Sequence, residues 1–201
     1  MAERVLLPDW RQPAHYGAAA AAGVTIAQAT IATAWNAQGP AARGTFADAA
    51  QALFGVALPT ITNTIASSDG LSVLWLGPES WLLVAGGVSS LVDFAARRNA
   101  LIAAGGALFD VSAARIAWTL SGPHAATVLA KGCPLDLDAR VFEPGHCAQS
   151  VYGHVGVLLV GHDAATFTLM VARSYARDVW RALLQAAAPY GAALRLPAPY
   201  G

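Results

Sequence analysis

The chain has 201 residues, a formal net charge of zero and a pI near 7.0, and only 12% of its residues are charged. Typical soluble domains carry about 25% charged residues, so a surface this poor in charge is prone to association. We expect partner chains to cover much of it, the alternative being a genomic bias toward alanine and arginine. The arginines are scattered without a basic run, which argues against nucleic-acid binding.

Cysteine content and hydropathy indicate the expected compartment. Cys133 and Cys147 do not amount to a disulfide framework in a chain of this size, which fits a reduced, cytoplasmic setting. The only membrane-like stretch, residues 17–35, contains no leucine and lacks the Lys/Arg region of a signal peptide. We expect no membrane segment, and membrane association through residues 17–35 is the weaker alternative.

The first part of the chain predicts an arm, a strand and a helix. Prolines and a run of alanines make residues 1–23 an irregular arm that we expect to lie on another surface, such as that of a partner subunit. β-Branched residues recur over 24–35 and favour a strand. An amphipathic helix is predicted over 46–54, with Gly55 after it, and residues 59–68 are predicted to be a polar connection.

A β-hairpin followed by a helix organises the middle of the chain. The hairpin is predicted over residues 71–85, with a Gly-Pro-Glu-Ser turn. Ser90 and Asp93 predict a capping box for a helix that ends at Gly105 and is followed by a strand at 107–111. The side chains that this helix is expected to bury are Leu91, Phe94, Ala95, Leu101 and Ile102.

The second part of the chain repeats much of this pattern. Trp81 corresponds to Phe167, and Phe94 to Trp180, at one constant offset, which indicates two copies of one supersecondary unit. Strands are predicted at 115–120, 147–152, 155–160, 166–171 and 192–196, a turn at 161–163 with His162 facing solvent, and helices at 122–130 and after a Ser174 cap. The last helix is expected to bury Tyr175, Val179, Trp180, Leu183 and Ala187.

The order of these elements predicts an α+β fold with mostly antiparallel sheet. We expect two pseudo-repeated ferredoxin-like (β-α-β-β-α-β) units within residues 24–196, with halves at about 24–111 and 112–196. Residues 1–23 precede this domain as the arm, and residues 197–201 follow it as a tail.

The sequence offers no common motif for nucleotide or metal binding. Its glycine pairs match neither the dinucleotide fingerprint nor a P-loop. Cys133, His146 and Cys147 could form a metal site with His124, but their spacing matches no recognised zinc pattern, so we expect two buried thiols and no metal. A cysteine nucleophile with His146 or His154 as its base is a weaker alternative, because no third, orienting group is indicated.

Asp110, Arg115 and Arg173 are the candidates for binding an anion. Each arginine adjoins a strand of the repeated core, from which it could reach an anionic ligand or the carboxylate of a partner. Because Asp110 is close to Arg115 in sequence, however, we expect an internal ion pair between them, with ligand binding as the alternative. The six tryptophans lie mostly at apolar-periodic positions and indicate core packing or interface anchoring.

Several motifs resemble the gamma subunit of sarcosine oxidase. The sequence LPT begins at Leu58, and LWLGPESWLL spans residues 74–83. The second half contains LSGP at 120–123, LAKGCPLDL at 129–137, PGxCAQ at 144–149 and VARSY at 171–175. The resemblance covers residues 23 to 188, and the KGCPLDL segment with its downstream PGxCAQ partner is specific.

The resemblance implies a small, flavin-free structural subunit without catalytic residues, in a heterotetrameric sarcosine oxidase with alpha, beta and delta partners. It implies that FAD, FMN, NAD and tetrahydrofolate are held by the partners, which oxidise sarcosine to glycine and pass the one-carbon unit to tetrahydrofolate or release it as formaldehyde. It also implies a fold related to the folate-binding domain of aminomethyltransferases. A free-standing folate-binding or aminomethyl-transfer protein that uses Asp110, Arg115 and Arg173 is the alternative.

Overall fold

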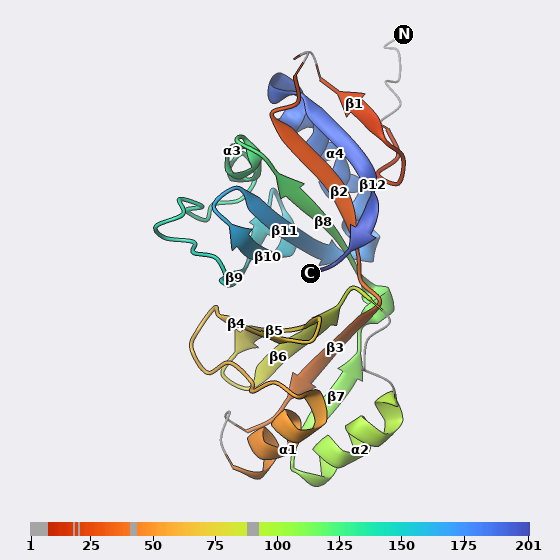
Figure 1. The fold of residues 1–201 in the computed structure, drawn as a ribbon, viewed down its shortest axis with the longest axis vertical. Coiled ribbons are helices and arrows are strands. Elements are labelled where there is room, and N and C mark those ends of the chain that lie inside the picture. The colour runs from red at the N-terminus through yellow and green to blue at the C-terminus, as the bar shows by residue number, and fades with distance from the viewer. Residues whose placement is uncertain (1–7, 18, 20, 41–43, 88–92) are drawn as a thin grey trace.

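The computed structural model describes residues 8–17, 19, 21–40, 44–87 and 93–201, and it has the predicted α+β architecture. Two β-sheets follow one another along the long axis of the molecule (Figure 1). The α-helices are α1 (Thr45–Phe54), α2 (Phe94–Ala103), α3 (Ala125–Ala130) and α4 (Ala176–Ala187). No helix among the described residues is long and apolar enough to cross a membrane.

Strands from the two parts of the chain form the two sheets. The first group is β1 (Ala14–Tyr16), β2 (Val24–Thr30), β3 (Thr33–Gln38), β4 (Ile65–Ser68), β5 (Leu71–Gly77), β6 (Ser80–Ala85) and β7 (Ala107–Asp110). The second group is β8 (Arg115–Ser121), β9 (Cys147–Tyr152), β10 (Val155–Asp163), β11 (Thr166–Ala172) and β12 (Ala192–Pro199). The larger sheet has the order β1-β12-β2-β8-β11-β10-β9, and the smaller has the order β4-β5-β6-β3-β7. All neighbouring strands are antiparallel except β12 and β2.

Three apolar clusters hold these layers together. One lies between the larger sheet and helices α3 and α4, and a second lies between the smaller sheet and helices α1 and α2. The third joins the two sheets and consists of Ala29, Ala34, Leu74, Leu82, Val84, Ala117, Cys147, Leu158, Val160, Met170 and Tyr200. Each sheet therefore has one face against helices and one face toward the other sheet.

The prediction of a single strand over residues 24–35 is wrong. The chain leaves the larger sheet after Thr30 and enters the smaller sheet at Thr33, so two strands form where one was expected. Ala29 and Ala34, on either side of this crossing, are both buried between the sheets. Small side chains at these positions let the backbone pass from one sheet to the other within a few residues.

The predicted connection at residues 59–68 is also partly wrong. Ile65–Ser68 forms strand β4, which pairs with β5 at the edge of the smaller sheet. Each half therefore has three strands between its helices, in the orders β3-α1-β4-β5-β6-α2-β7 and β8-α3-β9-β10-β11-α4-β12. The hairpin of β5 and β6 and the helix α1 agree with prediction, and Gly55 ends α1 in the left-handed conformation.

Helix α2 is more exposed than its pattern predicted. Leu101 is fully buried, but Ala95 is exposed and Ile102 is 49% exposed, because the helix contacts the smaller sheet over a narrow strip. Asp93 caps the helix by accepting a hydrogen bond from the Ala96 backbone N–H at 3.1 Å. Ser90 and Leu91, which were also assigned to this helix, lie outside the described residues.

Two details of the second half differ from prediction. A 3₁₀ turn at Arg173–Tyr175 precedes α4, so Tyr175 rather than Ser174 is the N-cap, and its side chain is 51% exposed instead of buried. His162 belongs to strand β10, and the turn lies after Asp163. The predicted burial of Val179, Trp180, Leu183 and Ala187 is confirmed.

Both ends of the described chain pack onto the larger sheet. Strand β1, within the region expected to be irregular, pairs with β12. Strand β12 runs to Pro199, into the expected tail, and the Tyr200 side chain is 5% exposed in the core between the sheets. The Tyr200 backbone N–H donates to Thr30 O at 3.0 Å, which fixes the tail beside the crossing of the chain.

Replacing Gly86 by alanine tests this anchoring of the tail. A Cβ at Gly86 would lie 2.2 Å from the backbone N and O of Tyr200, so the tail must move. We expect Gly86→Ala to lower the free energy of unfolding by about 1–3 kcal/mol, measured by urea denaturation. Gly87→Ala is the matched control, because nothing lies within 4 Å of its Cβ. Equal stability of the two variants would contradict the packing of Tyr200 against Gly86.

Candidate functional site

The structure brings two of the three predicted anion-binding residues together. Arg173 reaches back to the start of β8, where its Nε donates to Ala113 O at 2.7 Å and its Nη2 donates to Arg115 O at 3.0 Å. These bonds fix the backbone that positions Arg115. The Arg173 guanidinium is thereby held beside the backbone at the start of β8.

Asp110 does not join this pair. Its Oδ1 accepts hydrogen bonds from the Ser112 backbone N–H at 2.9 Å and from Ser112 Oγ at 2.6 Å. Ser112 Oγ also lies 2.9 Å from the Ala34 backbone N–H, which donates to it. No ion pair joins Asp110 to Arg115, so the predicted internal pair is wrong, and Asp110 instead stabilises the turn between β7 and β8.

Arg115 faces a hollow of about 220 Å³ at the edge of the two sheets. Its lining comes from both sheets and consists of Leu76, Arg115, Gln149, Ser150, Gly156, Val157 and Leu158. Gln149 Nε2 donates to Leu76 O at 2.7 Å and so links the two sheets at the rim of the hollow. Burial lowers the pKa of Arg115 from its ordinary value, because desolvation disfavours the charged guanidinium.

The cysteine and histidine candidates do not assemble into a reactive site. Cys133 and Cys147 are both buried free thiols, as predicted. Burial raises the pKa of Cys147 to about 11, so it is a protonated thiol at neutral pH and a poor nucleophile. Among the residues that the structure describes, no three or more His, Cys, Asp and Glu side chains are grouped so that they could hold a metal ion.

His162 lies at the opposite end of the gap between the sheets. Its Nε2 is 2.8 Å from Thr168 Oγ1, which in turn is 3.0 Å from Thr119 Oγ1. Its ring is 6.2 Å from that of the buried Tyr200. The side chain is exposed overall, as predicted, but desolvation at this contact lowers the pKa of His162, opposed in part by the charge of Asp163.

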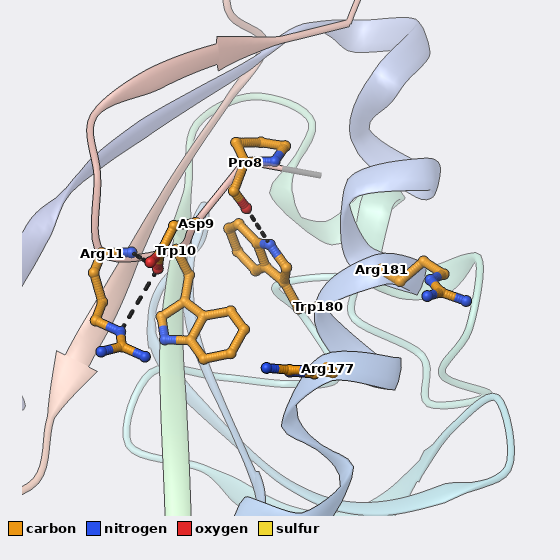
Figure 2. A pocket seen from close by; sticks show the side chains of 7 residues that line it. All are labelled: Pro8, Asp9, Trp10, Arg11, Arg177, Trp180 and Arg181. Atoms are coloured by element: carbon orange, nitrogen blue, oxygen red, sulfur yellow. Dashed lines mark hydrogen bonds and ion pairs between the residues drawn. The ribbon is translucent and has the colours of Figure 1, made fainter. Parts of the chain in front are cut away.

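A second hollow, of about 250 Å³, lies where the N-terminal arm crosses helix α4 (Figure 2). The indoles of Trp10 and Trp180 form its walls, with ring centroids 6.0 Å apart, and Trp180 Nε1 donates to Pro8 O at 2.9 Å. Figure 2 shows Arg177 extending from α4 toward Trp10, while Arg181 points away from both indoles. This end of the expected arm therefore packs on its own chain.

Similarity to known proteins shows the family to which the chain belongs. The profile of the sarcosine oxidase gamma subunit family matches residues 38–189, which is most of the chain. The chain belongs to the sarcosine oxidase gamma subunit family. The sarcosine oxidase subunit gamma of Corynebacterium sp. (strain U-96) is 33% identical over 140 residues, which cover 69% of this chain and 67% of that protein.

Solved structures agree with this membership of the gamma subunit family. A chain of the heterotetrameric sarcosine oxidase from Corynebacterium sp. U-96, in complex with pyrrole 2-carboxylate, superimposes with a TM-score of 0.71 and 28% identity over 83% of this chain and 85% of that one. The glycine cleavage system aminomethyltransferase T from Bartonella henselae superimposes with a TM-score of 0.59 and 16% identity over 81% of this chain and 46% of that one. The second likeness shows a shared fold, as the resemblance of the sequence implied.

Sequence reasoning missed the residues that complete the hollow beside Arg115. Gln149 and Leu76 meet there from different sheets, and no local pattern reports such a long-range contact. Gly156 is the one position with a local signal, because an isolated glycine inside a strand often marks a bend or the close approach of a ligand or another backbone. At Gly156 the space is open, since nothing lies within 4 Å of a Cβ placed there.

Trp10→Ala tests whether the arm is part of the fold of this gamma-family chain. Trp10 packs edge-on against Trp118 and Trp180 at 6.0 Å, and it is half-buried. We expect its removal to lower the free energy of unfolding by about 2–3 kcal/mol, measured by urea denaturation. Arg98→Ala is the control, because Arg98 is exposed on α2, which packs on the other sheet, and its removal should change stability by less than about 0.5 kcal/mol. Unchanged stability of Trp10→Ala would show that the arm is not anchored by the tryptophans.

His162 gives the chain a pH-dependent contribution to stability. Its pKa is lowered in the folded state, so the unfolded chain takes up a proton before the native chain does. This contribution is present above the unfolded pKa of about 6.5 and is lost as the pH falls below it. We expect the free energy of unfolding of His162→Gln to fall less on acidification than that of the wild type, as measured by urea denaturation at a series of pH values. Parallel curves for the two proteins would contradict this role of His162.

Proposed function

We propose that this chain is the gamma subunit of a heterotetrameric sarcosine oxidase, in which it assembles with alpha, beta and delta subunits. The observation that carries the proposal is the match of the gamma subunit family over residues 38–189, together with the superposition on the solved heterotetramer over 83% of the chain. The complex would oxidise sarcosine to glycine, with the one-carbon unit passed to tetrahydrofolate or released as formaldehyde.

The role of this chain in that complex would be structural, and the other subunits would hold FAD, FMN, NAD and tetrahydrofolate. The buried and protonated Cys147 supports a non-catalytic role, because the thiol lacks both access and nucleophilic character. The candidates for folate binding do not fit one site: Asp110 is bonded to Ser112 and Arg173 to backbone carbonyls, and neither lines the hollow beside Arg115. That hollow is also smaller than the roughly 300–1,000 Å³ of typical ligand pockets.

The surface of the chain supports burial by partners. Charged residues make up only 12% of the sequence, and a stable obligate interface buries roughly 2,000 Å² or more. Large apolar side chains are exposed on both sheets, on helix α2, and on turns and loops, and they are Ile61, Ile102, Phe109, Val141, Val151, Tyr175 and Leu196. Such side chains are suited to contacts with other subunits.

We further propose that the two halves are copies of one ferredoxin-like unit. The shared order of helices and strands in the two halves supports this, as does the sheet order β5-β6-β3-β7, which is the order of a ferredoxin-like sheet with β4 added at its edge. In the larger sheet, β10, β11, β8 and β12 take the same places, with β2 inserted between β8 and β12.

Assembly with the other subunits tests the proposed function. We expect this chain, co-expressed with the alpha, beta and delta chains encoded by the same organism, to elute with them as one four-chain complex with flavin absorbance, measured by size-exclusion chromatography with mass detection. Sarcosine oxidation should fall when this chain is omitted. A stable monomer that ignores those chains and binds tetrahydrofolate by itself would refute the subunit role and support the alternative of a folate-binding protein.

A further inference from the structure

We propose that the hollow beside Arg115 is a docking site for an Asp or Glu side chain of a neighbouring subunit in the assembled complex. This inference rests on the proposed function, since it requires that the chain assembles with others. The partner carboxylate would accept a paired hydrogen bond from the Arg115 guanidinium, with the side chain lying in the hollow between the two sheets.

The backbone directs Arg115 into the gap between the sheets. Ile116 and Trp118 belong to the cluster on the helix side of the larger sheet, and Ala117 belongs to the cluster between the sheets. Because side chains alternate along a strand, Arg115 lies on the same face as Ala117. Its presence in one hollow with Leu76 of the smaller sheet agrees with this direction.

Small residues on the neighbouring strands leave the space that the guanidinium faces. Arg115 pairs with Ala172 on β11, and Gly156 is the hollow-lining position on β10. Leu158, two residues after Gly156, belongs to the cluster between the sheets, so Gly156 is on that same face. A side chain at position 156 would fill the hollow, and its absence keeps the space open.

Nothing in the described part of the chain neutralises Arg115. The ion pairs among the described residues join Asp9 to Arg11 and Asp138 to Arg140, and the Arg115 guanidinium makes no hydrogen bond to a described residue. None of the residues that line the hollow is acidic. The side chain is half-buried, and a desolvated charge without a partner is unfavourable, so an incoming carboxylate would relieve a cost that the isolated chain bears.

The surroundings favour a side chain of another protein over a free anion. Gln149 and Ser150 of β9, an edge strand of the larger sheet, line the hollow, so a partner that approaches this edge beyond Cys147 would reach it. Val151 on β9 is 40% exposed and shares a strand face with Gln149 at the rim. Arginine is among the residues enriched at interface hot spots, and the Arg173 guanidinium is bonded to the Arg115 carbonyl close by.

Three variants of this chain in the co-expressed complex test the docking site. Arg115→Met removes the charge and keeps the length of the side chain, and Gly156→Val fills the hollow at a strand position where the added atoms meet open space. Arg98→Met is the matched control, because Arg98 is exposed on α2, away from the gap. Dissociation of each purified complex on dilution is followed by size-exclusion chromatography with mass detection.

We expect Arg115→Met and Gly156→Val each to raise the dissociation constant by about 30-fold or more, and Arg98→Met to change it by less than about twofold. The melting temperature of the isolated chain should be equal or higher in Arg115→Met, because the variant removes an unpaired, desolvated charge. Loss of assembly without loss of stability is a result that a merely structural role of Arg115 would not give.

Three results would overturn the docking site. The first is assembly of Arg115→Met and Gly156→Val with wild-type affinity. The second is a fall in the melting temperature of the isolated Arg115→Met chain, which would make Arg115 a structural residue. The third is stabilisation of the isolated wild-type chain by acetate, but not of Arg115→Met, with assembly unaffected, which would assign the hollow to a free anion. Failure of the wild-type chain to assemble would instead refute the proposed function itself.

Discussion

The contact between the inner faces of the two sheets is the constraint on which the rest of the fold depends. A sheet covered by helices on one side still exposes its other face, and here each sheet buries that face against the other. Small and medium side chains dominate the contact, with Ala29, Ala34 and Ala117 among its members. The sheets can therefore lie close together, but only where both present such residues, and this requirement sets where the chain crosses from one sheet to the other.

The ends of the chain complete the same contact. Tyr200 inserts between the sheets from the C-terminal end, and the absence of a side chain at Gly86 lets its backbone pass. The N-terminal residues seal the opposite side of the larger sheet, where Trp10 packs on Trp118 and Trp180. The N-terminal part adds β1 and β2 to the larger sheet, which explains why it has seven strands whereas the smaller has five.

The sequence predicted the elements with local signals and missed those decided by distant contacts. The hairpin of β5 and β6 has alternating residues and a turn, and it forms as predicted. The break at residues 31–32 carries no glycine or proline, so β-branched residues on both sides read as one strand. Strand β4 was missed because serine and threonine serve loops as well as edge strands, and pairing with β5 decides between them.

The candidate site was predictable in its residues but not in its arrangement. Arg115 and Arg173 were identified from their positions beside strands, whereas the bond from Arg173 to the Arg115 carbonyl depends on the 3₁₀ turns that follow β7 and β11. Asp110 was a plausible partner for Arg115 by distance along the chain. Ser112 is closer in space and satisfies the carboxylate with two hydrogen bonds, which leaves the arginine without a counter-charge.

The two ends of the gap between the sheets differ in whether their polar and charged side chains have partners within the chain. At the Tyr200 end, His162, Thr168 and Thr119 form a continuous row of hydrogen-bonding contacts, and the buried Tyr200 ring lies beside hollows that His162 lines. At the Arg115 end, Gly156 and Ala172 leave the space open around a half-buried cation. An apolar side chain at position 115 would close this end at no electrostatic cost. A guanidinium is unfavourable there in the isolated chain and becomes favourable only when an anion binds to it. The residue that destabilises the isolated subunit would therefore stabilise the assembled complex.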